Sequence, residues 1–377
     1  MDSERRAFIV AQNGSRIFGG GEHYVVGLLA RLQARGHRVL FLCRDEYVRS
    51  EAERRGVEAR VFHVGGHLAL HDGVRLARFL EREAPDALFL TSFNKTFVAA
   101  LAGRMAGMPR IIARFGLSSD IPSRRFVYPI ALRRWVHRVV VNSTPFRDAV
   151  RESLPRVAPE RIITIYNGVD IPERRNEPGA VRRELGISPV APVIGALARL
   201  SGQKRLDRLI RITAALPPEV VCLIAGHGPG EADLRALAGE IGVADRVRFL
   251  GYREDVADVL DALDVYVVTS ATEGLSNSML EALACGVPVI STPVSGASVA
   301  LEPLADGRVP GRIVEADLEA LTAAVGELLR DPDLRGGMSE AARDRILERF
   351  NWDDKLDRWE RLFTGDPMAP VGEGEST

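Results

Sequence analysis

Two carboxylates eight residues apart, Glu273 and Glu281, stand in a stretch whose residue types could bind a sugar phosphate. Residues 265–292 predict a strand, a loop, a helix capped by Ser276 or Asn277, and a second strand. This order puts Glu273 at the carboxyl end of a strand and Glu281 on the following helix, where open α/β sheets bind ligands. We therefore expect both carboxylates to face one crevice and to accept hydroxyl protons from a sugar.

The residues between the two carboxylates could hold the phosphate itself. Gly274 and Leu275 lie at the predicted helix N-terminus, where unpaired N–H groups and the helix dipole favour an anion. An alternative remains open: Glu281 could be an ordinary acid near the start of a solvated helix, because this spacing is common by chance.

Two cations could supply the charge that a diphosphate needs. Arg199 follows the predicted strand 193–198, and Lys204 comes five residues later at a predicted helix start, so both could reach one anion. A cation at a helix N-terminus is unfavourable unless a bound anion compensates it. The alternative is that Lys204 simply faces solvent.

Glycine-rich turns follow several predicted strands. In the loop 13–24, Gly19 and Gly20 let the backbone approach a phosphate at a helix N-terminus. The loop lacks both the G-x-G-x-x-G spacing and the P-loop lysine, which argues against a nicotinamide cofactor and NTP hydrolysis. The alternative is a glycine turn needed only for packing. Tyr252, in a turn after the predicted strand 247–250, could lie beside a base.

Strands and helices must alternate to position these loops. Apolar runs predict strands at residues 7–11, 37–43, 57–64, 87–91, 110–114, 138–142, 161–166, 193–198, 220–225, 247–250, 265–269, 287–291 and 312–314, with helical patterns between most of them. Such alternation predicts parallel sheets with helices on both faces. The fold class is therefore α/β, with two doubly wound Rossmann-like domains and an interdomain cleft.

The segment 167–189 breaks this alternation with glycine, proline and charges, and predicts the domain boundary. We expect an N-terminal domain over 1–170, completed by a C-terminal helix at 351–363, and a second domain over 171–350. The tail 364–377 is too rich in glycine, proline and acids to bury a core and is predicted to be disordered.

Composition points to a reduced intracellular setting. The three cysteines have neither paired nor metal-ligand spacing, and the N-terminus resembles neither a signal peptide nor a membrane span, so we expect a cytoplasmic protein. The net charge of −1 conceals 29 basic and 18 acidic residues in 1–175. Such an asymmetry is typical of a protein with a charged partner.

The basic half contains a stretch, 123–138, in which arginines alternate with aromatic and aliphatic residues. The residues that could contact an anionic membrane, and with it a lipid-linked acceptor, are Arg124, Arg125, Arg133, Arg134 and Trp135. The alternative is a helix that faces the core and leaves its arginines solvated.

Together these pieces resemble the retaining glycosyltransferases of family 4, the glycosyl transferases group 1, which have the GT-B architecture. The resemblance covers nearly the whole chain in family order, through GGGE (19–22), RGHRV (35–39), NGVD (167–170), ARLSGQKRLDRLI (198–210), AGHGP (225–229), VRFLGYRED (247–255) and EGLSNSMLEALACGVPVIST (273–292). The combination is specific, whereas any single piece is weak.

The resemblance implies a hexosyltransferase that uses a UDP- or GDP-sugar as co-substrate, with no cofactor, no metal and no nucleic acid. Glu281 would bind ribose hydroxyls, Glu273 the hydroxyls of the donor sugar, and Arg199 with Lys204 the diphosphate. The amides of Gly274 and Leu275 would assist. Gly19 or Gly20 would approach the distal phosphate, and the backbone near Tyr252 would contact the base.

This chain departs from the family pattern in two places, and the sequence leaves two rival functions open. Many members carry a histidine where this chain has Arg114 to Leu117, and residues 295–314 are atypical. A sugar epimerase or synthase could use the same nucleotide site. A two-domain sugar-binding protein would also close a cleft between α/β domains, although it would normally be exported.

Overall fold

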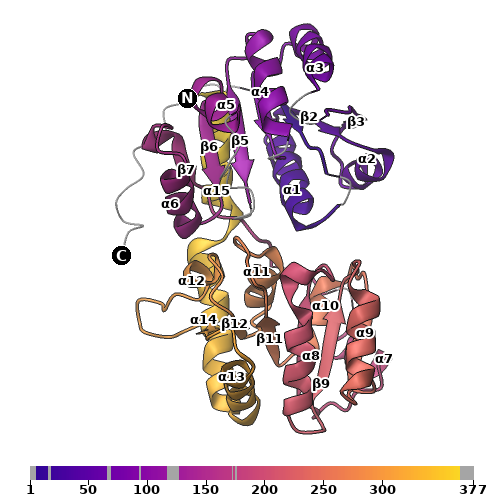
Figure 1. The fold of residues 1–377 in the computed structure, drawn as a ribbon. Coiled ribbons are helices and arrows are strands. Elements are labelled where there is room, and N and C mark those ends of the chain that lie inside the picture. The colour runs from indigo at the N-terminus through magenta and orange to yellow at the C-terminus, as the bar shows by residue number, and fades with distance from the viewer. Residues whose placement is uncertain are drawn as a thin grey trace. The chain divides into compact units, whose positions relative to one another are not determined.

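The structure is a computed structural model of the 377-residue chain, and it describes residues 6–15, 18–65, 69–92, 95–116, 127–171, 173–174 and 176–365. The chain forms two compact units (Figure 1). Unit 1 comprises Met1–Asn167 and Trp352–Thr377, and unit 2 comprises Gly168–Asn351. The sequence places these divisions at 170/171 and 350/351.

Unit 1 is built on a parallel sheet that, within the described residues, has seven strands in the order β3-β2-β1-β4-β5-β6-β7. The strands are β1 (Phe8–Gln12), β2 (Arg38–Cys43), β3 (Ala59–Val61), β4 (Ala87–Leu90), β5 (Ile111–Phe115), β6 (Arg138–Val141) and β7 (Ile162–Thr164). Most are short apolar runs buried on both faces, as is typical of parallel sheets.

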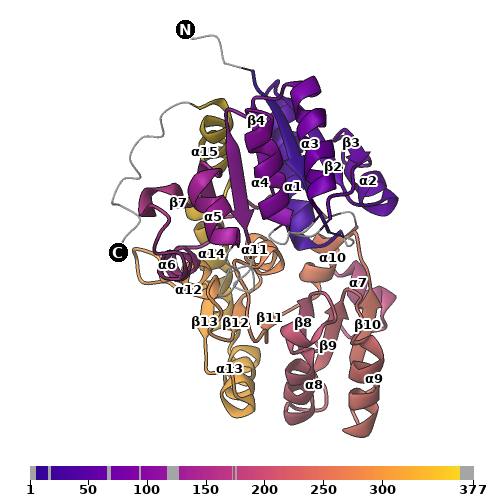
Figure 2. The same cartoon turned by 45° about the horizontal axis from the view of Figure 1, so that its top comes forward.

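Helices cover both faces of this sheet. One face packs on α1 (Gly20–Ala34), α2 (Glu46–Glu53) and α15 (Trp352–Thr364). The other packs on α3 (Leu70–Glu83), α4 (Thr96–Met105), α5 (Val127–Arg134) and α6 (Thr144–Ser153). A 3₁₀ turn, η3 (Pro159–Arg161), precedes β7. The indole N–H of Trp359 donates to the hydroxyl of Tyr24 at 2.9 Å, so the last helix is fixed to the first. Figure 2 shows the helices of unit 1, including α15, from a second direction.

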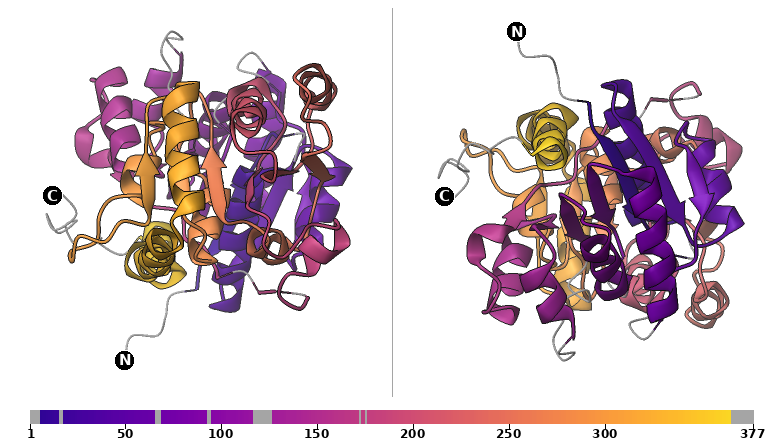
Figure 3. Two further views of the ribbon diagram at one scale, coloured as in Figure 1. Left: turned by 90° about the horizontal axis from the view of Figure 1, so that it is seen from below. Right: turned by 90° about the horizontal axis from the view of Figure 1, so that it is seen from above.

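Unit 2 repeats this plan with a parallel sheet whose described strands have the order β10-β9-β8-β11-β12-β13. They are β8 (Val193–Leu197), β9 (Val221–Ala225), β10 (Val247–Gly251), β11 (Val265–Val268), β12 (Val289–Ser291) and β13 (Gly311–Ile313). The other elements are α7 (Ala180–Glu184), η4 (Gly202–Lys204), α8 (Leu206–Ala215), α9 (Glu231–Glu240), α10 (Val256–Asp261), α11 (Asn277–Ala284), α12 (Ala297–Ala300), α13 (Leu318–Arg330) and α14 (Pro332–Arg349). Figure 3 gives two further views.

The structure confirms the predicted α/β fold with two doubly wound, Rossmann-like units. Each predicted strand is present, with ends that differ by a few residues, as is usual for boundaries read from sequence. Helix α15 belongs to unit 1 and extends through Thr364. The remainder of the tail expected at 364–377 lies, from residue 366 onward, outside the described residues.

Among the described residues, no helix combines the length and the apolar composition needed to cross a bilayer. Cys43, Cys222 and Cys285 are free thiols, and burial raises the pKa of each of them. None of the three is therefore a reactive thiolate at neutral pH.

Candidate nucleotide-sugar site

The predicted strand–loop–helix stretch forms as expected. The strand β11 is buried throughout, and Ser276 caps α11 by accepting a hydrogen bond from the amide of Met279 at 3.4 Å. Gly286 follows the helix with φ +76°, a left-handed conformation that glycine adopts without steric cost. Glu273 thus stands in the loop at the carboxyl end of β11, and Glu281 stands on α11.

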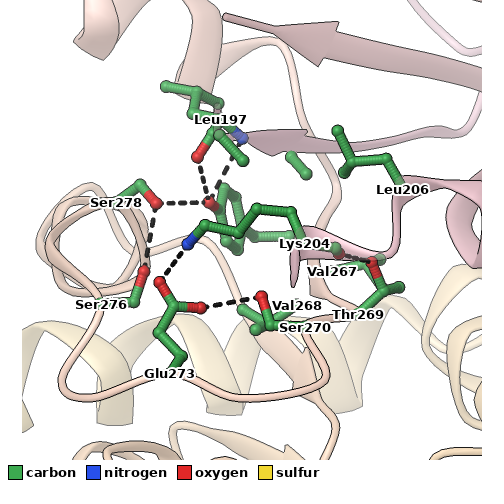
Figure 4. A pocket seen from close by; sticks show the side chains of 13 residues that line it. Leu197, Lys204, Leu206, Val267, Val268, Thr269, Ser270, Glu273, Ser276 and Ser278 are labelled. Atoms are coloured by element: carbon green, nitrogen blue, oxygen red, sulfur yellow. Dashed lines mark hydrogen bonds and ion pairs between the residues drawn. The ribbon is translucent and has the colours of Figure 1, made fainter. Parts of the chain in front are cut away.

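Glu273 lies in a small pocket with Lys204 (Figure 4). The ammonium group of Lys204 forms an ion pair with Oε1 of Glu273, and the hydroxyl of Ser270 donates to Oε2 at 2.9 Å. Glu273 is only 7% exposed, so its charge depends on these two partners. The structure therefore brings together Lys204, which is predicted to bind phosphate, and Glu273, which is predicted to bind the sugar.

A line of hydroxyl groups continues the pocket wall beside the ion pair (Figure 4). The hydroxyl of Tyr266 accepts from the amide of Leu197 at 3.2 Å and lies 2.8 Å from the hydroxyl oxygen of Ser278. The hydroxyl oxygens of Ser278 and Ser276 are 3.2 Å apart. Burial raises the pKa of the Tyr266 hydroxyl above its ordinary value, so this group stays protonated at neutral pH.

Backbone contacts hold the loop after β8 against the loop after β11. The amide of Ala271 donates to the carbonyl of Gln203 at 2.9 Å, and the side chain of Gln203 donates to the carbonyl of Thr272 at 2.8 Å. The hydroxyl of Thr269 donates to the carbonyl of Lys204 at 2.9 Å. These bonds fix the separation between the lysine and the glutamate backbones.

The residues after β12 also support the loop that carries Glu273, which the sequence did not reveal. The hydroxyl of Ser295 donates to the carbonyl of Glu273 at 2.7 Å. Gly296 lies so close that a Cβ atom there would be 2.4 Å from the carbonyl oxygen of Gly274 and from Cα of Leu275. The only signal in the sequence was the glycine itself, in a stretch that departs from the family pattern.

Lys204 is not at a helix start, contrary to the prediction. It ends η4, and Arg205 follows in a left-handed conformation with φ 48° before α8 begins at Leu206. The cation is compensated by the carboxylate of Glu273 rather than requiring a bound anion. The dipole argument for a bound anion therefore does not apply in this structure.

The two predicted carboxylates differ in their surroundings. Glu273 lines the pocket, whereas Glu281 is not among the residues that line it. Burial and, second, the negative charge of Asp170 raise the pKa of Glu281 to about 7. A carboxyl group with this pKa is partly protonated and partly ionised near neutral pH, and such perturbed pKa values cluster at functional sites.

Arg199 follows the carboxyl end of β8 and Tyr252 follows that of β10, with β9 between these two strands, and neither residue lines the pocket. Arg199 is exposed, and its side chain has no hydrogen bond or ion pair with any described residue. Tyr252 is 52% exposed, with its ring 6.1 Å from the ring of His227. Both side chains are therefore accessible to a ligand.

The turn after β9 serves the packing of the loop that carries Arg199. Gly226 has φ +128°, and a Cβ at this position would be 2.0 Å from the carbonyl oxygen of Ala198. The amide of Leu200 donates to the carbonyl of His227 at 3.1 Å, and that of Gly230 to the carbonyl of Leu200 at 3.0 Å. Gly226 is therefore needed for the close approach of these two backbones within unit 2.

In unit 1, Gly19 caps α1 and Gly20 begins it. The amide of Gly19 donates to the carboxylate of Glu22 at 3.1 Å, and the side-chain amide of Asn13 donates to the same carboxylate at 3.3 Å. A phosphate at this helix start would have to displace Glu22 from Gly19. The phosphate contact assigned to Gly19 or Gly20 remains a prediction.

Arg114, which stands near the position of the family histidine, is in β5 and 8% exposed. Its guanidinium lies 4.3 Å from the centre of the Tyr24 ring and donates to the side-chain oxygen of Asn167 at 2.9 Å. These contacts hold the end of β5 to α1 and to the last residue before unit 2.

The predicted membrane stretch is described only in part. Arg124 and Arg125 lie outside the described residues, and Arg133 and Arg134 are exposed on α5. The ring of Trp135 packs against Phe97 at 5.5 Å and against the core of unit 1, so the packing alternative is correct for this residue. No group of three or more potential metal ligands occurs within the described ranges.

Two families of glycosyltransferases match the chain, one over most of unit 1 and the other over most of unit 2. The family described as Glycosyltransferase Family 4 matches residues 18–173, and the family described as Glycosyl transferases group 1 matches residues 180–345.

Curated relatives align with part of the chain. A GDP-mannose-dependent monoacylated alpha-(1-6)-phosphatidylinositol monomannoside mannosyltransferase of Corynebacterium glutamicum is 33% identical over 218 residues, which are 53% of this chain and 55% of that protein. A D-inositol 3-phosphate glycosyltransferase of Mycobacterium marinum is 32% identical over 58% of this chain and 48% of that protein. The chain thus spans about half the length of these relatives.

Solved structures show the same fold. HepE of Anabaena, in complex with UDP and glucose, has a TM-score of 0.82 at 22% identity and covers 96% of this chain and 100% of its own. WaaG, a glycosyltransferase involved in lipopolysaccharide biosynthesis, has a TM-score of 0.71 at 18% identity over 95% and 100% of the two chains.

Proposed function

Because this chain belongs to the GT-B glycosyltransferases of family 4, we propose that it moves a sugar from a UDP- or GDP-linked donor to a saccharide or lipid-linked acceptor. The observation that carries the proposal is the pocket at the carboxyl ends of β8 and β11, where Lys204 and Glu273 meet. The relatives that act on phosphatidylinositol mannoside and inositol phosphate support a role in the synthesis of envelope polysaccharide or glycolipid.

In this proposal, Glu273 orients the donor sugar through its hydroxyls and does not attack it. Its carboxylate is already held by Lys204 and Ser270, so it is fixed in one orientation before the sugar arrives. Lys204 and the accessible Arg199 stabilise the charge that develops on the diphosphate, with the amides of Gly274 and Leu275 just before α11. Glu281 accepts hydrogen bonds from the ribose hydroxyls.

We propose that transfer proceeds with retention and without a metal ion. The bond between the anomeric carbon and the diphosphate oxygen breaks, and the acceptor oxygen bonds to that carbon on the same face and passes its proton to the diphosphate. Two cations and the amides of the loop would carry the charge of the leaving group, which is the part that a metal ion plays in other transferases. The enzyme would work in the cytoplasm, at the inner face of the membrane.

Incubation with a panel of UDP- and GDP-sugars and mass spectrometry of the products tests this function. We expect one nucleotide sugar to be consumed, with release of the nucleoside diphosphate and a mass gain of one hexose on an acceptor. Conversion of the donor to an isomeric nucleotide sugar would identify an epimerase instead. Tight binding of free sugar with no donor consumed would identify a sugar-binding protein.

A further inference from the structure

A buried tyrosine of the pocket wall, Tyr266, stands where two strands of unit 2 separate. In the described sheet, the ladder between β8 and β11 ends with the pair Tyr266 and Gly195. The strands β9 and β10 lie on one side of this pair of strands, and β12 and β13 lie on the other. Open α/β sheets bind ligands at such a reversal of strand order, and the pocket with Lys204 and Glu273 lies at this separation.

The hydroxyl of Tyr266 takes the place of the next backbone rung. Leu197, two residues beyond Gly195 on β8, has no ladder partner on β11 in the described sheet. Its amide donates to the Tyr266 hydroxyl at 3.2 Å, and its carbonyl lies 3.0 Å from the same hydroxyl as an acceptor. One phenol thus serves both backbone groups at the end of β8, which phenylalanine would leave without this partner.

The same hydroxyl reaches the first turn of α11 (Figure 4). The hydroxyl oxygen of Ser278 lies 2.8 Å from that of Tyr266, and the hydroxyl oxygen of Ser276 lies 3.2 Å from that of Ser278. Tyr266 has one proton for two acceptors, so Ser278 must donate back whenever this proton goes to Leu197. Ser276 in turn accepts from the amide of Met279 as the cap of the helix. The hydrogen bonds therefore run from the end of β8 to the N-terminus of α11.

This connection supports a part of the site that the other contacts do not reach. The contacts of Gln203 with the loop after β11 extend only to Thr272. They stop before the two amides that are expected to meet the diphosphate, whereas Ser278 lies just after those amides. Because Tyr266 is buried, its hydrogen bonds lie in a medium of low dielectric, where they are stronger than in water.

We propose that Tyr266 is a positioning residue for the transfer, because its hydroxyl sets the distance between the end of β8 and the first turn of α11. The two cations of the site follow β8, whereas Glu273 and the amides of Gly274 and Leu275 precede α11. One hydroxyl therefore holds the two halves of the site in register. The inference rests on the proposed function, to which it adds a residue that has no proposed contact with the donor.

A double-mutant cycle of Y266F and S278A tests this role. Y266F keeps the ring and removes only the hydroxyl, and S278A removes the partner of that hydroxyl on α11. We expect each change to lower kcat on the order of tenfold or more, because the amides that meet the leaving group shift. The KM for the donor should change by less than about threefold, since Glu281 in the next turn still holds the ribose. The double variant should lose no more than Y266F alone, because both changes break the same bond.

The matched control is Y166F, which removes a buried tyrosine hydroxyl from unit 1. The hydroxyl of Tyr166 lies 2.7 Å from that of Thr144, so the control also breaks a bond between two hydroxyl groups. It should keep the parent's kcat, even where its melting temperature falls. Hydrogen exchange gives a second readout that needs no transfer. The amides of residues 273–281 should exchange faster in Y266F and S278A than in the parent, and at the parent's rate in Y166F.

The proposal is wrong if Y266F keeps the parent's kcat, whether or not its exchange is faster, because the bond would then hold the helix without serving the transfer. It is also wrong if the losses in the cycle simply add, or if Y166F loses as much kcat as Y266F. A parent that consumes no nucleotide sugar would contradict the proposed function instead. The hold of Tyr266 on α11 would then stand or fall with the exchange rates at 273–281.

Discussion

Replacing Gly296 by alanine should damage the site by displacing the loop that carries Glu273, although Gly296 itself has no proposed contact with the donor. The added Cβ would lie 2.4 Å from the carbonyl oxygen of Gly274 and from Cα of Leu275. Both are backbone atoms, so no flexible side chain can move aside to make room. The loop that carries Glu273 must shift, or α12 must move away from it.

The size of the shift follows from the contact distance. Ordinary contacts of a Cβ atom begin at 3.4 Å, so atoms now at 2.4 Å must separate by about 1 Å. Overpacking of this kind typically costs about 1 to 3 kcal/mol of stability. A displacement of 1 Å at positioned groups can lower a rate on the order of a hundredfold.

The assay is steady-state transfer with the identified donor, together with thermal unfolding. We expect kcat to fall on the order of a hundredfold, since Glu273 is misplaced relative to Lys204. The matched control is G337A, because Gly337 lies inside α14 with nothing within 4 Å of its added Cβ. This control should keep its activity and gain up to about 1 kcal/mol in stability.

The reasoning would be refuted by a G296A variant that has the parent's kcat and the parent's melting temperature. A variant that loses stability but keeps kcat would show that α12 yields instead of the loop. In that case Gly296 would serve packing alone, and the positioning of Glu273 would rest on Ser295 and the contacts with η4.

Three further outcomes are expected. K204A should lower transition-state stabilisation by about 2 to 4 kcal/mol, measured as kcat/KM, because the diphosphate loses a fixed cation and Glu273 loses its ion-pair partner. Because the pKa of Glu281 is raised to about 7, its carboxyl group is ionised in about one molecule in eleven at pH 6 and in about ten in eleven at pH 8. Calorimetry with UDP or GDP should therefore show roughly tenfold tighter binding at pH 8 than at pH 6. The variant E281Q should lose that difference. EDTA should leave transfer intact, and a loss of activity that Mg²⁺ or Mn²⁺ restores would contradict the metal-independent mechanism.

The sequence predicted the fold well because apolar runs and helix caps are local signals. The strand β11, the cap at Ser276 and the glycine stop at Gly286 were all read from neighbouring residues, and all are present. The pairing of Lys204 with Glu273 could not be read in this way. It depends on the register between β8 and β11, which places residues 69 positions apart side by side.

The same limit explains the other differences. The left-handed Arg205, which delays the start of α8, carries no glycine or asparagine signal. The sequence left Trp135 open between membrane contact and core packing because arginines surround it, and its packing on Phe97 depends on how α4 and α5 meet. The support from Ser295 and Gly296 was missed because a glycine that admits a neighbouring backbone looks the same in sequence as a glycine in any loop.

The return of α15 to unit 1 has a consequence for how the chain folds as it leaves the ribosome. Trp359 packs on Phe89 at 5.0 Å and bonds to Tyr24, yet it follows the whole of unit 2 in the chain. At ordinary rates of translation, roughly 10 to 40 s pass between the synthesis of Asn167 and that of Trp352. During that interval the apolar face of unit 1 that α15 covers is open to water. Unit 2 can therefore complete its core first, although it is encoded second.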